Sequence, residues 1–539
     1  MLTQQQLMQA VQAAAAALEQ GQLASAKAQS ETVLAAAPGE PNASQIMALV
    51  LMREDNAQAA VTHLRNANQS MPDHPPVLNM LGVALGPTGN RAAARKEFVK
   101  VKGLAPDYLD ARFNLAQLEI DENQFSQALT EYNDILAAQP LNAEALAGRA
   151  KASLLLHDIG DAIEDAEQGL KIDETNVSAS LTLAEAKLRN GEAELGRQIA
   201  LQVVARKDIA PSDRANAFGL AADAADRLGL YDEAFNNYTE SNNAFAFLSR
   251  HVMSEPPSPY NPLTIRKLMD HLKDVAGDAP PPCADHQVAF LIGFPRSGTT
   301  LLEQVLAAHP QVTSHGERTA LSDACGDLLL SEDGLNKLGH LNEVQAAYYR
   351  TTYWQEIAKL GPLPAKGDIY LDKMPVNTVF LPVIAKVFPT AKILFAVRDP
   401  RDVVLSCFQQ RFTFNQAMYQ LLSLGKAAKY YDQVMALGVK ARELFELQIC
   451  DLRYDDIVDD LEGQARQAIE FLGLEWDPQV LDYRDSIKSR AVVTPSAGQV
   501  VEPIYRRSLG KWKNYEAQLA PVLAQLAPWV SHWGYGDEN

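Results

Sequence analysis

The segment VAFLIGFPRSGTT (residues 288–300) decides the fold of the second half of the chain. Its first five residues have the pattern of a short buried strand, and an amphipathic helix is predicted from Leu301 to about His309. The turn between them carries Gly293 and Gly298, spaced as in a nucleotide-binding P-loop. Glycines and backbone N–H groups at a helix N-terminus form an anion cradle, so the turn predicts a phosphate-type ligand.

The same turn lacks the lysine that a nucleoside triphosphatase needs. Thr299 stands at the position from which that lysine would reach the β- and γ-phosphates. The turn offers a cation earlier, at Arg296. A kinase or ATPase is therefore disfavoured, and a different phosphate ligand is predicted.

Further apolar strand patterns follow along the chain. They cover residues 369–371, 393–397 and 447–452, and the last two run directly into Arg398 and Arg453. Helical stretches separate these strands, which is typical of a parallel α/β sheet. Ligands of such sheets bind at the carboxyl ends of the strands, so the residues that follow each strand are candidates for the site.

The first half of the chain repeats with a period of 34 residues. Prolines mark the period, and two series of small residues keep it, with a large apolar residue four positions after the second series. Small residues let paired helices approach closely, and proline stops the second helix of a pair. The prolines are Pro38, Pro72, Pro106 and Pro140; the small residues are Ala14, Ala48, Gly82, Ala116, Ala150 and Ala184, then Ala26, Ala60, Ala94, Ala128, Ala162 and Gly196; the large ones are Leu64, Phe98 and Tyr132.

This pattern resembles the tetratricopeptide repeat. Six units run from about residue 6 to residue 210, and a seventh follows an insertion near Asp213, with Ala222, Ala234 and Tyr238 in the corresponding places. Such solenoids expose a groove that holds a peptide or another protein, and they equally serve as dimerisation surfaces. The sequence leaves a protein partner and a homodimer both open.

The length and the change of pattern predict two domains. A chain of 539 residues is too long for one hydrophobic core. We predict a tetratricopeptide solenoid over residues 1–250, a proline-rich linker with a short helix over 251–287, and an α/β domain over 288–539. The expected fold class is α plus α/β.

Composition narrows the partners and the compartment. With 48 basic and 67 acidic residues the net charge is −19, so the chain is a poor general binder of nucleic acid or anionic membrane. The four cysteines have neither disulfide nor metal spacing, which predicts reduced thiols and no metal. The N-terminus lacks signal-peptide features, and no apolar run approaches about 18 residues. We expect a cytoplasmic protein without a membrane segment.

Two motifs in the second domain resemble those of sulfotransferases that use 3′-phosphoadenosine-5′-phosphosulfate (PAPS). Residues 294–300 are similar to the 5′-phosphosulfate loop, and residues 397–406 are similar to the 3′-phosphate site. The resemblance implies that PAPS is the co-substrate. It implies cofactor contacts from Arg296, Ser297, Gly298, Thr299 and Thr300 in the loop, and from Arg398 and Ser406 at the 3′-phosphate.

The tyrosylprotein sulfotransferase type is the nearest match within that family. Its catalytic glutamate corresponds to Glu317, and its lysine-proline element to the stretch that contains Lys373. The loop that closes over the cofactor corresponds to the stretch carrying Ser496 and Lys511, and Tyr454 corresponds to the tyrosine placed near the adenine. One departure is Gln410, which stands where a further cofactor arginine is expected, with Arg411 next to it.

The resemblance assigns a role to each candidate. Arg296 and Lys373 would neutralise the transferring sulfonate and the leaving phosphate, Ser496 would donate a hydrogen bond there, and Glu317 would accept the proton of the acceptor hydroxyl. His315 is the alternative base. Glu317 could instead cap a helix or pair with Arg318, Lys373 could be a surface lysine, and Tyr454 could be core packing.

Two classes of function follow. The first is a PAPS-dependent sulfotransferase that acts on a hydroxyl, with protein tyrosine as the expected acceptor and the repeats as the part that recruits it. A carbohydrate or small-molecule acceptor remains an alternative, since the fold is shared across acceptor classes. The second class is an interaction scaffold with a non-catalytic nucleotide-binding domain. The complete set of charged residues favours the enzyme.

Overall fold

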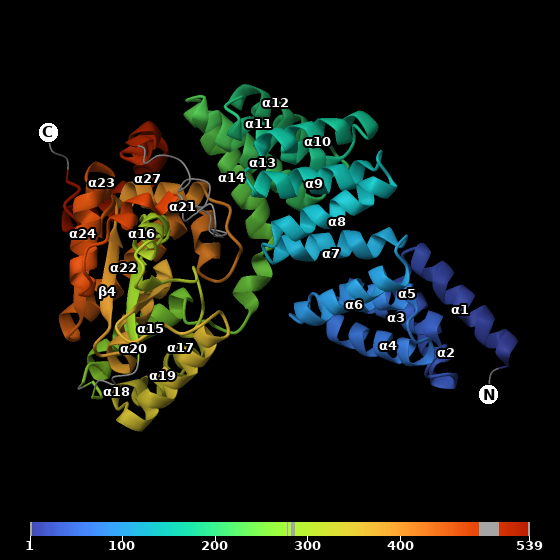
Figure 1. Cartoon of the computed structure of the whole chain (residues 1–539), viewed down its shortest axis with the longest axis horizontal. Coiled ribbons are helices and arrows are strands. Elements are labelled where there is room, and N and C mark those ends of the chain that lie inside the picture. Colours follow the sequence, from blue (N-terminus) through green and yellow to red (C-terminus); the bar gives the residue numbers. More distant parts are fainter. Residues whose placement is uncertain (1–2, 278, 282–285, 485–505, 537–539) are drawn as a thin grey trace. The chain divides into compact units, whose positions relative to one another are not determined.

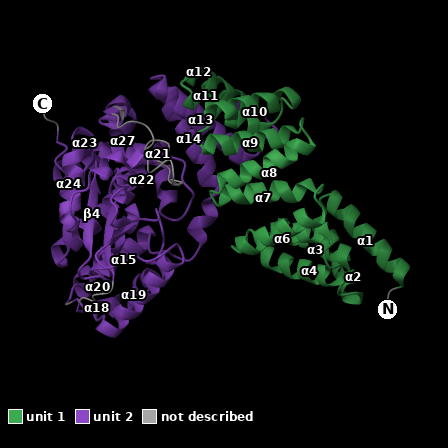
Figure 2. Cartoon of the chain, viewed as in Figure 1, with its two compact units in different colours: residues 1–203 green, residues 204–539 purple. Residues whose placement is uncertain are grey.

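The computed structural model describes residues 3–277, 279–281, 286–484 and 506–536. The chain divides into two compact units, residues 1–203 and residues 204–539 (Figure 2). The division falls within the last helix of the sixth repeat. The helix pair of the seventh repeat therefore belongs to the second compact unit, although the sequence period assigns it to the solenoid.

Unit 1 consists of helices paired as antiparallel hairpins (Figure 1). They are α1 (Gln4–Glu19), α2 (Leu23–Ala36), α3 (Pro41–Arg53), α4 (Ala57–Ser70), α5 (Pro75–Leu85), α6 (Arg91–Leu104), α7 (Leu109–Asp121), α8 (Phe125–Ala138), α9 (Ala143–Leu155), α10 (Ile159–Ile172), α11 (Val177–Arg189) and α12 (Ala193–Ala205). Each pair covers one 34-residue period, so the predicted helical repeat is confirmed.

Close helix packing explains the small residues of the repeat. A Cβ atom on Gly82 would lie 2.4 Å from the ring of Phe98, so the large residue of one helix fills the space that glycine leaves on its partner. Ala116 and Ala128, which lie 34 residues after Gly82 and Ala94, are completely buried in the next unit. Helix α8 ends at Ala138, two residues before Pro140, in agreement with the expected role of proline as a stop.

Unit 2 is built on a five-stranded parallel sheet in the order β2-β3-β1-β4-β5. The strands are β1 (Gln287–Gly293), β2 (Val312–Thr313), β3 (Ile369–Lys373), β4 (Lys392–Val397) and β5 (Gln448–Arg453). The four predicted strands are confirmed, while the sequence did not indicate β2, which has only two residues. Chain order reverses at β1, whose neighbours are β3 and β4, and this is where ligands of open parallel sheets bind.

Both faces of the sheet are buried. Along β1, Phe290 and Ile292 join one hydrophobic cluster, and Ala289 and Leu291 join another on the opposite face. The surrounding elements are α13 (Pro211–Arg227), α14 (Tyr231–Leu248), η1 (Arg250–Ser254), α15 (Pro262–Val275), α16 (Thr299–Ala307), α17 (Ser322–Leu329), α18 (Glu332–Gly339), α19 (Glu343–Ala358), η2 (Pro375–Phe380), α20 (Leu381–Val387), α21 (Pro400–Gln409), η3 (Met418–Leu422), α22 (Leu424–Leu444), α23 (Tyr454–Asp459), α24 (Leu461–Leu472), η4 (Pro478–Asp482), η5 (Arg506–Ser508), η6 (Lys511–Tyr515) and α27 (Glu516–His532).

Helices α13 and α14 share a core with the sheet. Ala222 and Tyr238 belong to the same buried cluster as Phe290. The Phe235 ring of α14 stacks on Phe408 of α21 with centroids 5.2 Å apart, and Asn242 Nδ2 donates to the carbonyl of Phe408 at 2.8 Å. The seventh helix pair therefore packs as part of the α/β unit.

The segment predicted as a linker is also fastened to the α/β unit. Gln416, which is buried, accepts a hydrogen bond from the Ser258 backbone N–H at 2.8 Å and one from Asn261 Nδ2 at 3.0 Å. Its own amide donates to the carbonyl of Val252 at 3.2 Å. The predicted short helix is present as α15.

None of the helices in the described ranges is both long enough and apolar enough to cross a membrane. Cys325, Cys407 and Cys450 are buried free thiols.

Candidate functional site

Three neighbouring strands deliver the predicted residues to one edge of the sheet. In the register, Leu291 of β1 pairs with Lys373 of β3, and Gly293 of β1 pairs with Ala396 of β4. The turn after β1, the end of β3 and the residues after β4 therefore lie at the same level. Arg296, Lys373 and Arg398 are brought together at the carboxyl edge, where the sequence predicted the ligand site.

The turn after β1 needs its glycines for steric reasons. Gly293 has φ 155°, and a Cβ there would lie 2.5 Å from the carbonyl oxygen of Ala396. Gly298 has φ 95°, and its Cβ would lie 2.5 Å from the ring of Tyr454. Between them Arg296 adopts φ 71°, a left-handed conformation that is uncommon outside glycine. The chain thus accepts local strain in the tight turn that leads into helix α16.

The two motifs of the predicted cofactor site contact each other directly. Arg296 Nε donates a hydrogen bond to Ser406 Oγ at 3.0 Å. One terminal nitrogen of Arg398 donates to the backbone carbonyl of Arg296 at 3.1 Å. The turn after β1 and helix α21 therefore lie in direct contact.

Arg398 has the features of an anion-binding residue. It is only 7% exposed, its guanidinium lies 4.9 Å from the ring centroid of Tyr454, and it stands 3.9 Å from Asp402. Its Nε has no hydrogen-bond partner among the described residues. Buried polar groups are nearly always paired, so this orphaned donor fits a phosphate oxygen.

Lys373 lies between two carboxylates. Its side chain is 0% exposed, and its Nζ lies 2.8 Å from Glu317 Oε1 and 3.3 Å from Glu303 Oε2. The two predicted catalytic residues are thus in direct contact. Glu317 does not cap α17, which begins at Ser322. The ion pair of Glu317 is with Lys373, while Arg318 Nε donates to the carbonyl of His315 at 2.8 Å. The sequence analysis missed Glu303, although a charged residue on the apolar helix α16, one turn after Thr299, is a signal that could have found it.

Asp372 is buried beside this group. Its Oδ2 accepts a hydrogen bond from the Tyr353 hydroxyl at 2.8 Å, while its Oδ1 has no partner among the described residues. Burial raises the pKa of Asp372 to about 7. The hydrogen bond from Tyr353 and the charge of Lys373 oppose this rise, and the charge of Glu303 adds to it.

The described C-terminal residues cover the predicted 3′-phosphate motif. Asp402 accepts hydrogen bonds from the backbone N–H groups of Gly510 and Trp512, both at 2.8 Å. Burial raises the pKa of Asp402 to about 6. Tyr454 Oη lies 3.3 Å from Ser508 Oγ, which places the predicted adenine-side tyrosine at this segment. Ser496 lies outside the described residues.

Two other cations point toward helix α13. Lys511 Nζ lies 2.8 Å from Asp226 Oδ2 and 2.9 Å from Gln409 Oε1. Arg411 follows Gln410, the residue that stands where a cofactor arginine is expected, and its guanidinium lies 2.8 Å from Asp223 Oδ2. Both basic residues that follow the cofactor motifs in the sequence are therefore held by acidic residues of the seventh helix pair. The cofactor role of Lys511 stays a prediction.

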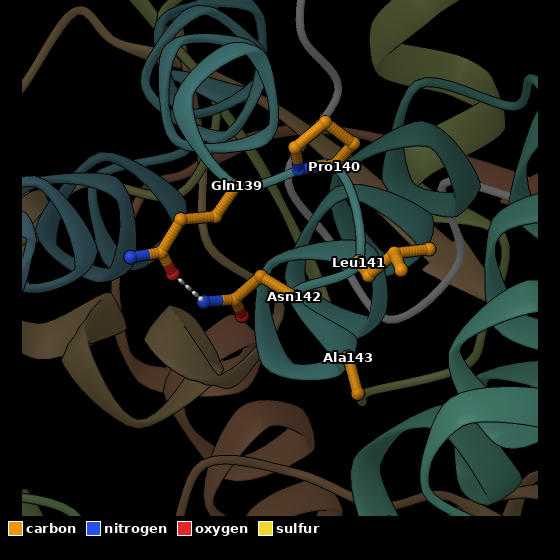
Figure 3. Close-up of a pocket in the computed structure, with 5 residues that line it drawn as sticks. All are labelled: Gln139, Pro140, Leu141, Asn142 and Ala143. Carbon is orange, nitrogen blue, oxygen red and sulfur yellow. Dashed lines mark hydrogen bonds between the residues drawn. The ribbon is translucent and has the colours of Figure 1, made fainter.

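A hollow in unit 1 lacks the charged side chains of the site in unit 2 (Figure 3). It is lined by five consecutive residues, 139–143, at the turn between α8 and α9, and Gln139 and Asn142 share a hydrogen bond of 2.8 Å there. No charged side chain lines it. Among the described residues, no group of three or more histidine, cysteine, aspartate or glutamate side chains is arranged to hold a metal ion.

Comparison with known proteins identifies the class. The model of the sulfotransferase family matches residues 289–478, the part that holds the sheet and the motifs described above. Protein-tyrosine sulfotransferase 1 of Mus musculus is 30% identical over 277 residues, which cover 47% of this chain and 73% of that protein. The chain therefore belongs to the sulfotransferase family.

Other relatives match a similar share of this chain. Protein-tyrosine sulfotransferase 2 of Gallus gallus is 29% identical over 266 residues, covering 46% of this chain and 68% of that protein. An uncharacterized protein of Aquifex aeolicus is 30% identical over 249 residues, covering 44% of this chain and 32% of that protein. The chain thus spans about a third of the length of the Aquifex protein and about two thirds of the Gallus protein.

Solved structures similar to the chain include helical-repeat proteins. A tetratricopeptide repeat protein from Parabacteroides merdae has a TM-score of 0.38 and 12% identity, covering 44% of this chain and 93% of that one. The type IV pilus biogenesis factor PilW has a TM-score of 0.36 and 22% identity, covering 39% of this chain and 96% of that one. The repeat assignment itself rests on the 34-residue period and the helix pairs of unit 1.

Proposed function

We propose that the chain is a PAPS-dependent sulfotransferase that sulfates a hydroxyl group, with tyrosine in a protein as the acceptor. The observation that carries the proposal is the contact between the two motifs, in which Arg296 Nε reaches Ser406 Oγ at 3.0 Å. One continuous site with a glycine turn and a buried, unpaired arginine donor suits a nucleotide with phosphate groups at its 5′ and 3′ positions.

The residues of the chain would divide the work. PAPS supplies the sulfuryl group when it is bound. The turn from Ser297 to Thr300 at the start of α16 and the Arg296 guanidinium would bind the 5′-phosphosulfate, while Arg398 and Ser406 would bind the 3′-phosphate. Lys373 would stabilise the charge that develops on the leaving oxygen, and Glu317 would accept the acceptor proton. The 33% exposure of the Glu317 side chain leaves it within reach of an acceptor.

The relatives support tyrosine as the acceptor, since the Mus musculus and Gallus gallus proteins carry protein-tyrosine sulfotransferase in their names. We further propose that the repeats of unit 1 recruit the acceptor protein or a partner, as helical-repeat grooves commonly do.

Calorimetric titration tests the co-substrate. The protein should bind 3′,5′-adenosine bisphosphate and should bind ADP and ATP much more weakly. Arg398→Ala should weaken this binding at least about tenfold, because a charge-assisted hydrogen bond contributes roughly 1.5–3 kcal/mol. Arg466→Ala, which removes an exposed arginine from α24, is the matched control. Equal binding of ATP, or no binding at all, would contradict the proposal and favour the interaction scaffold.

Glu317→Gln tests the base. The variant should still bind 3′,5′-adenosine bisphosphate but should transfer the sulfuryl group to tyrosine peptides about 10²–10⁴ times more slowly, which is the usual effect of losing a general base. Glu462→Gln makes the same change in an exposed pair on α24 and should keep full activity. Normal turnover by Glu317→Gln would remove Glu317 from the mechanism and leave His315 as the candidate.

A further inference from the structure

The two carboxylates at Lys373 come from different elements. Glu317 lies in the segment between β2 and α17, and its side chain is 33% exposed. Glu303 lies on helix α16, which the anion-binding turn begins, and its side chain is only 3% exposed. One carboxylate can therefore meet an acceptor at the surface, whereas the other is enclosed by the protein.

Each oxygen of Glu303 has a different neighbour. Oε1 accepts a hydrogen bond from the Ser314 hydroxyl at 2.7 Å, and Oε2 faces Lys373 Nζ at 3.3 Å. The Ser314 bond fixes the carboxylate, and the rigid helix fixes its backbone. The Glu303 carboxylate is therefore held in one position opposite Lys373, which is fully buried.

Lys373 needs such a partner during the reaction. A fully buried ammonium group is costly unless a carboxylate remains close to it. Glu317 makes the shorter of the two contacts with Lys373, at 2.8 Å. When Glu317 turns to accept the proton of an acceptor hydroxyl, its contact with Lys373 weakens, and Glu303 is the carboxylate that remains.

We propose that Glu303 is a positioning residue that holds the Lys373 ammonium at the carboxyl end of β3 while Glu317 acts as the base. This role rests on the proposed sulfotransferase function. Glu303 is too buried to touch the acceptor, so it acts through Lys373. The two carboxylates therefore have separate tasks, one at the reacting hydroxyl and one behind the cation.

Glu303→Gln removes the charge and keeps the side-chain shape and an oxygen for Ser314. We expect kcat for sulfation of a tyrosine peptide to fall about 10–100-fold, the range that a small misplacement of a catalytic group produces. The Kd of 3′,5′-adenosine bisphosphate should change less than about threefold, because Arg398 and the turn still bind the phosphates. Glu303→Asp keeps the charge and should recover part of the rate. Glu462→Gln is again the matched control.

A double-mutant cycle with Lys373→Ala separates positioning from a general structural effect. If Glu303 acts through Lys373, Glu303→Gln should lower the rate of the protein that retains Lys373. It should have almost no further effect on the rate of the Lys373→Ala protein. Urea unfolding gives a second measurement that does not depend on activity. Glu303→Gln should lower the free energy of unfolding when Lys373 is present. It should not lower it in the Lys373→Ala protein, where the Glu303 charge is already unpaired.

The outcomes distinguish the two levels of the argument. An equal loss of rate from Glu303→Gln in both backgrounds, or an unchanged rate in the presence of Lys373, would overturn the positioning role while leaving the sulfotransferase function intact. Failure of the unaltered protein to bind 3′,5′-adenosine bisphosphate would overturn the proposed function and the role of Glu303 together. Coupled effects in rate and in stability are the result we expect.

Discussion

The buried carboxyl of Asp372 should make the stability of unit 2 depend on pH. Its pKa of about 7 lies above the ordinary value of 3.8, so the folded protein keeps a proton that the unfolded chain releases. Stability therefore falls as pH rises from about 4 to about 7, because the unfolded state binds fewer protons over that interval. Above about pH 7 the loss is complete, and the buried charge remains.

Asp372→Asn removes this dependence, since the amide has no proton to release. In the comparison of pH 5 with pH 8, the stability of the unaltered protein falls over the two pH units between about pH 5 and the folded pKa of about 7. At about 1.4 kcal/mol for each unit, the unaltered protein should lose roughly 3 kcal/mol that the variant keeps. The amide nitrogen placed at Oδ1 would have no acceptor among the described residues, and this fixed cost of about 1–3 kcal/mol applies equally at both pH values.

Urea unfolding followed by tryptophan fluorescence measures the difference. All five tryptophans lie between residues 354 and 533, so the signal reports unit 2. The quantity to compare is the free energy of unfolding of the variant minus that of the unaltered protein, at pH 8 and at pH 5, because the fixed amide cost cancels. It should be about 3 kcal/mol larger at about pH 8.

Asp327→Asn provides a control of opposite sign. The ion pair with Lys337 and the hydrogen bond from Tyr349 lower the pKa of Asp327, so its contribution is present at neutral pH and is lost in acid. That variant should lose its stability difference as pH falls. Parallel pH curves for Asp372→Asn and the unaltered protein would refute the reasoning, because they would mean that burial does not shift the Asp372 carboxyl.

Two further predictions concern the seventh helix pair. Asp226→Asn breaks the ion pair with Lys511 and weakens the acceptor of the Tyr515 hydroxyl, so urea unfolding should show a loss of about 1–3 kcal/mol in unit 2. A fragment of residues 204–539 should unfold cooperatively. A fragment of residues 251–539 should aggregate or lose the cooperative transition, because it exposes the apolar surface that the helix pair covers. Size-exclusion chromatography and urea titration distinguish the two fragments.

Local sequence signals predicted the parts of the site that lie next to strands. The turn after β1 could be read directly, because a buried strand, two glycines and a helix start occur within about fifteen residues. Arg398 directly follows an apolar strand, and Lys373, which the family resemblance indicates, is the last residue of another strand. The carboxyl ends of parallel strands converge whatever lies between them, so these residues met although they are far apart in sequence.

Contacts that depend on side-chain direction could not be predicted in this way. Glu303 sits in a helix whose other residues are mostly apolar, and the sequence does not say that Lys373, one strand away, would face it. The strand β2 has two residues and no pattern of its own, so only its pairing with β3 reveals it. Neither feature has a local signal because both arise from tertiary packing.

The seventh helix pair shows why sequence period and structural unit need not coincide. The repeat pattern describes how α13 packs on α14, and Ala222 and Ala234 satisfy it as buried small residues. The pattern says nothing about the other faces of these helices, which stack Phe235 on Phe408 and direct Asp226 to Lys511. A helix pair can thus keep the repeat pattern in its sequence and pack as part of the α/β unit, because its two faces obey separate packing requirements. A substitution in α13 is therefore expected to act on the C-terminal segment that covers the predicted cofactor motif, even though α13 belongs to the repeats by sequence.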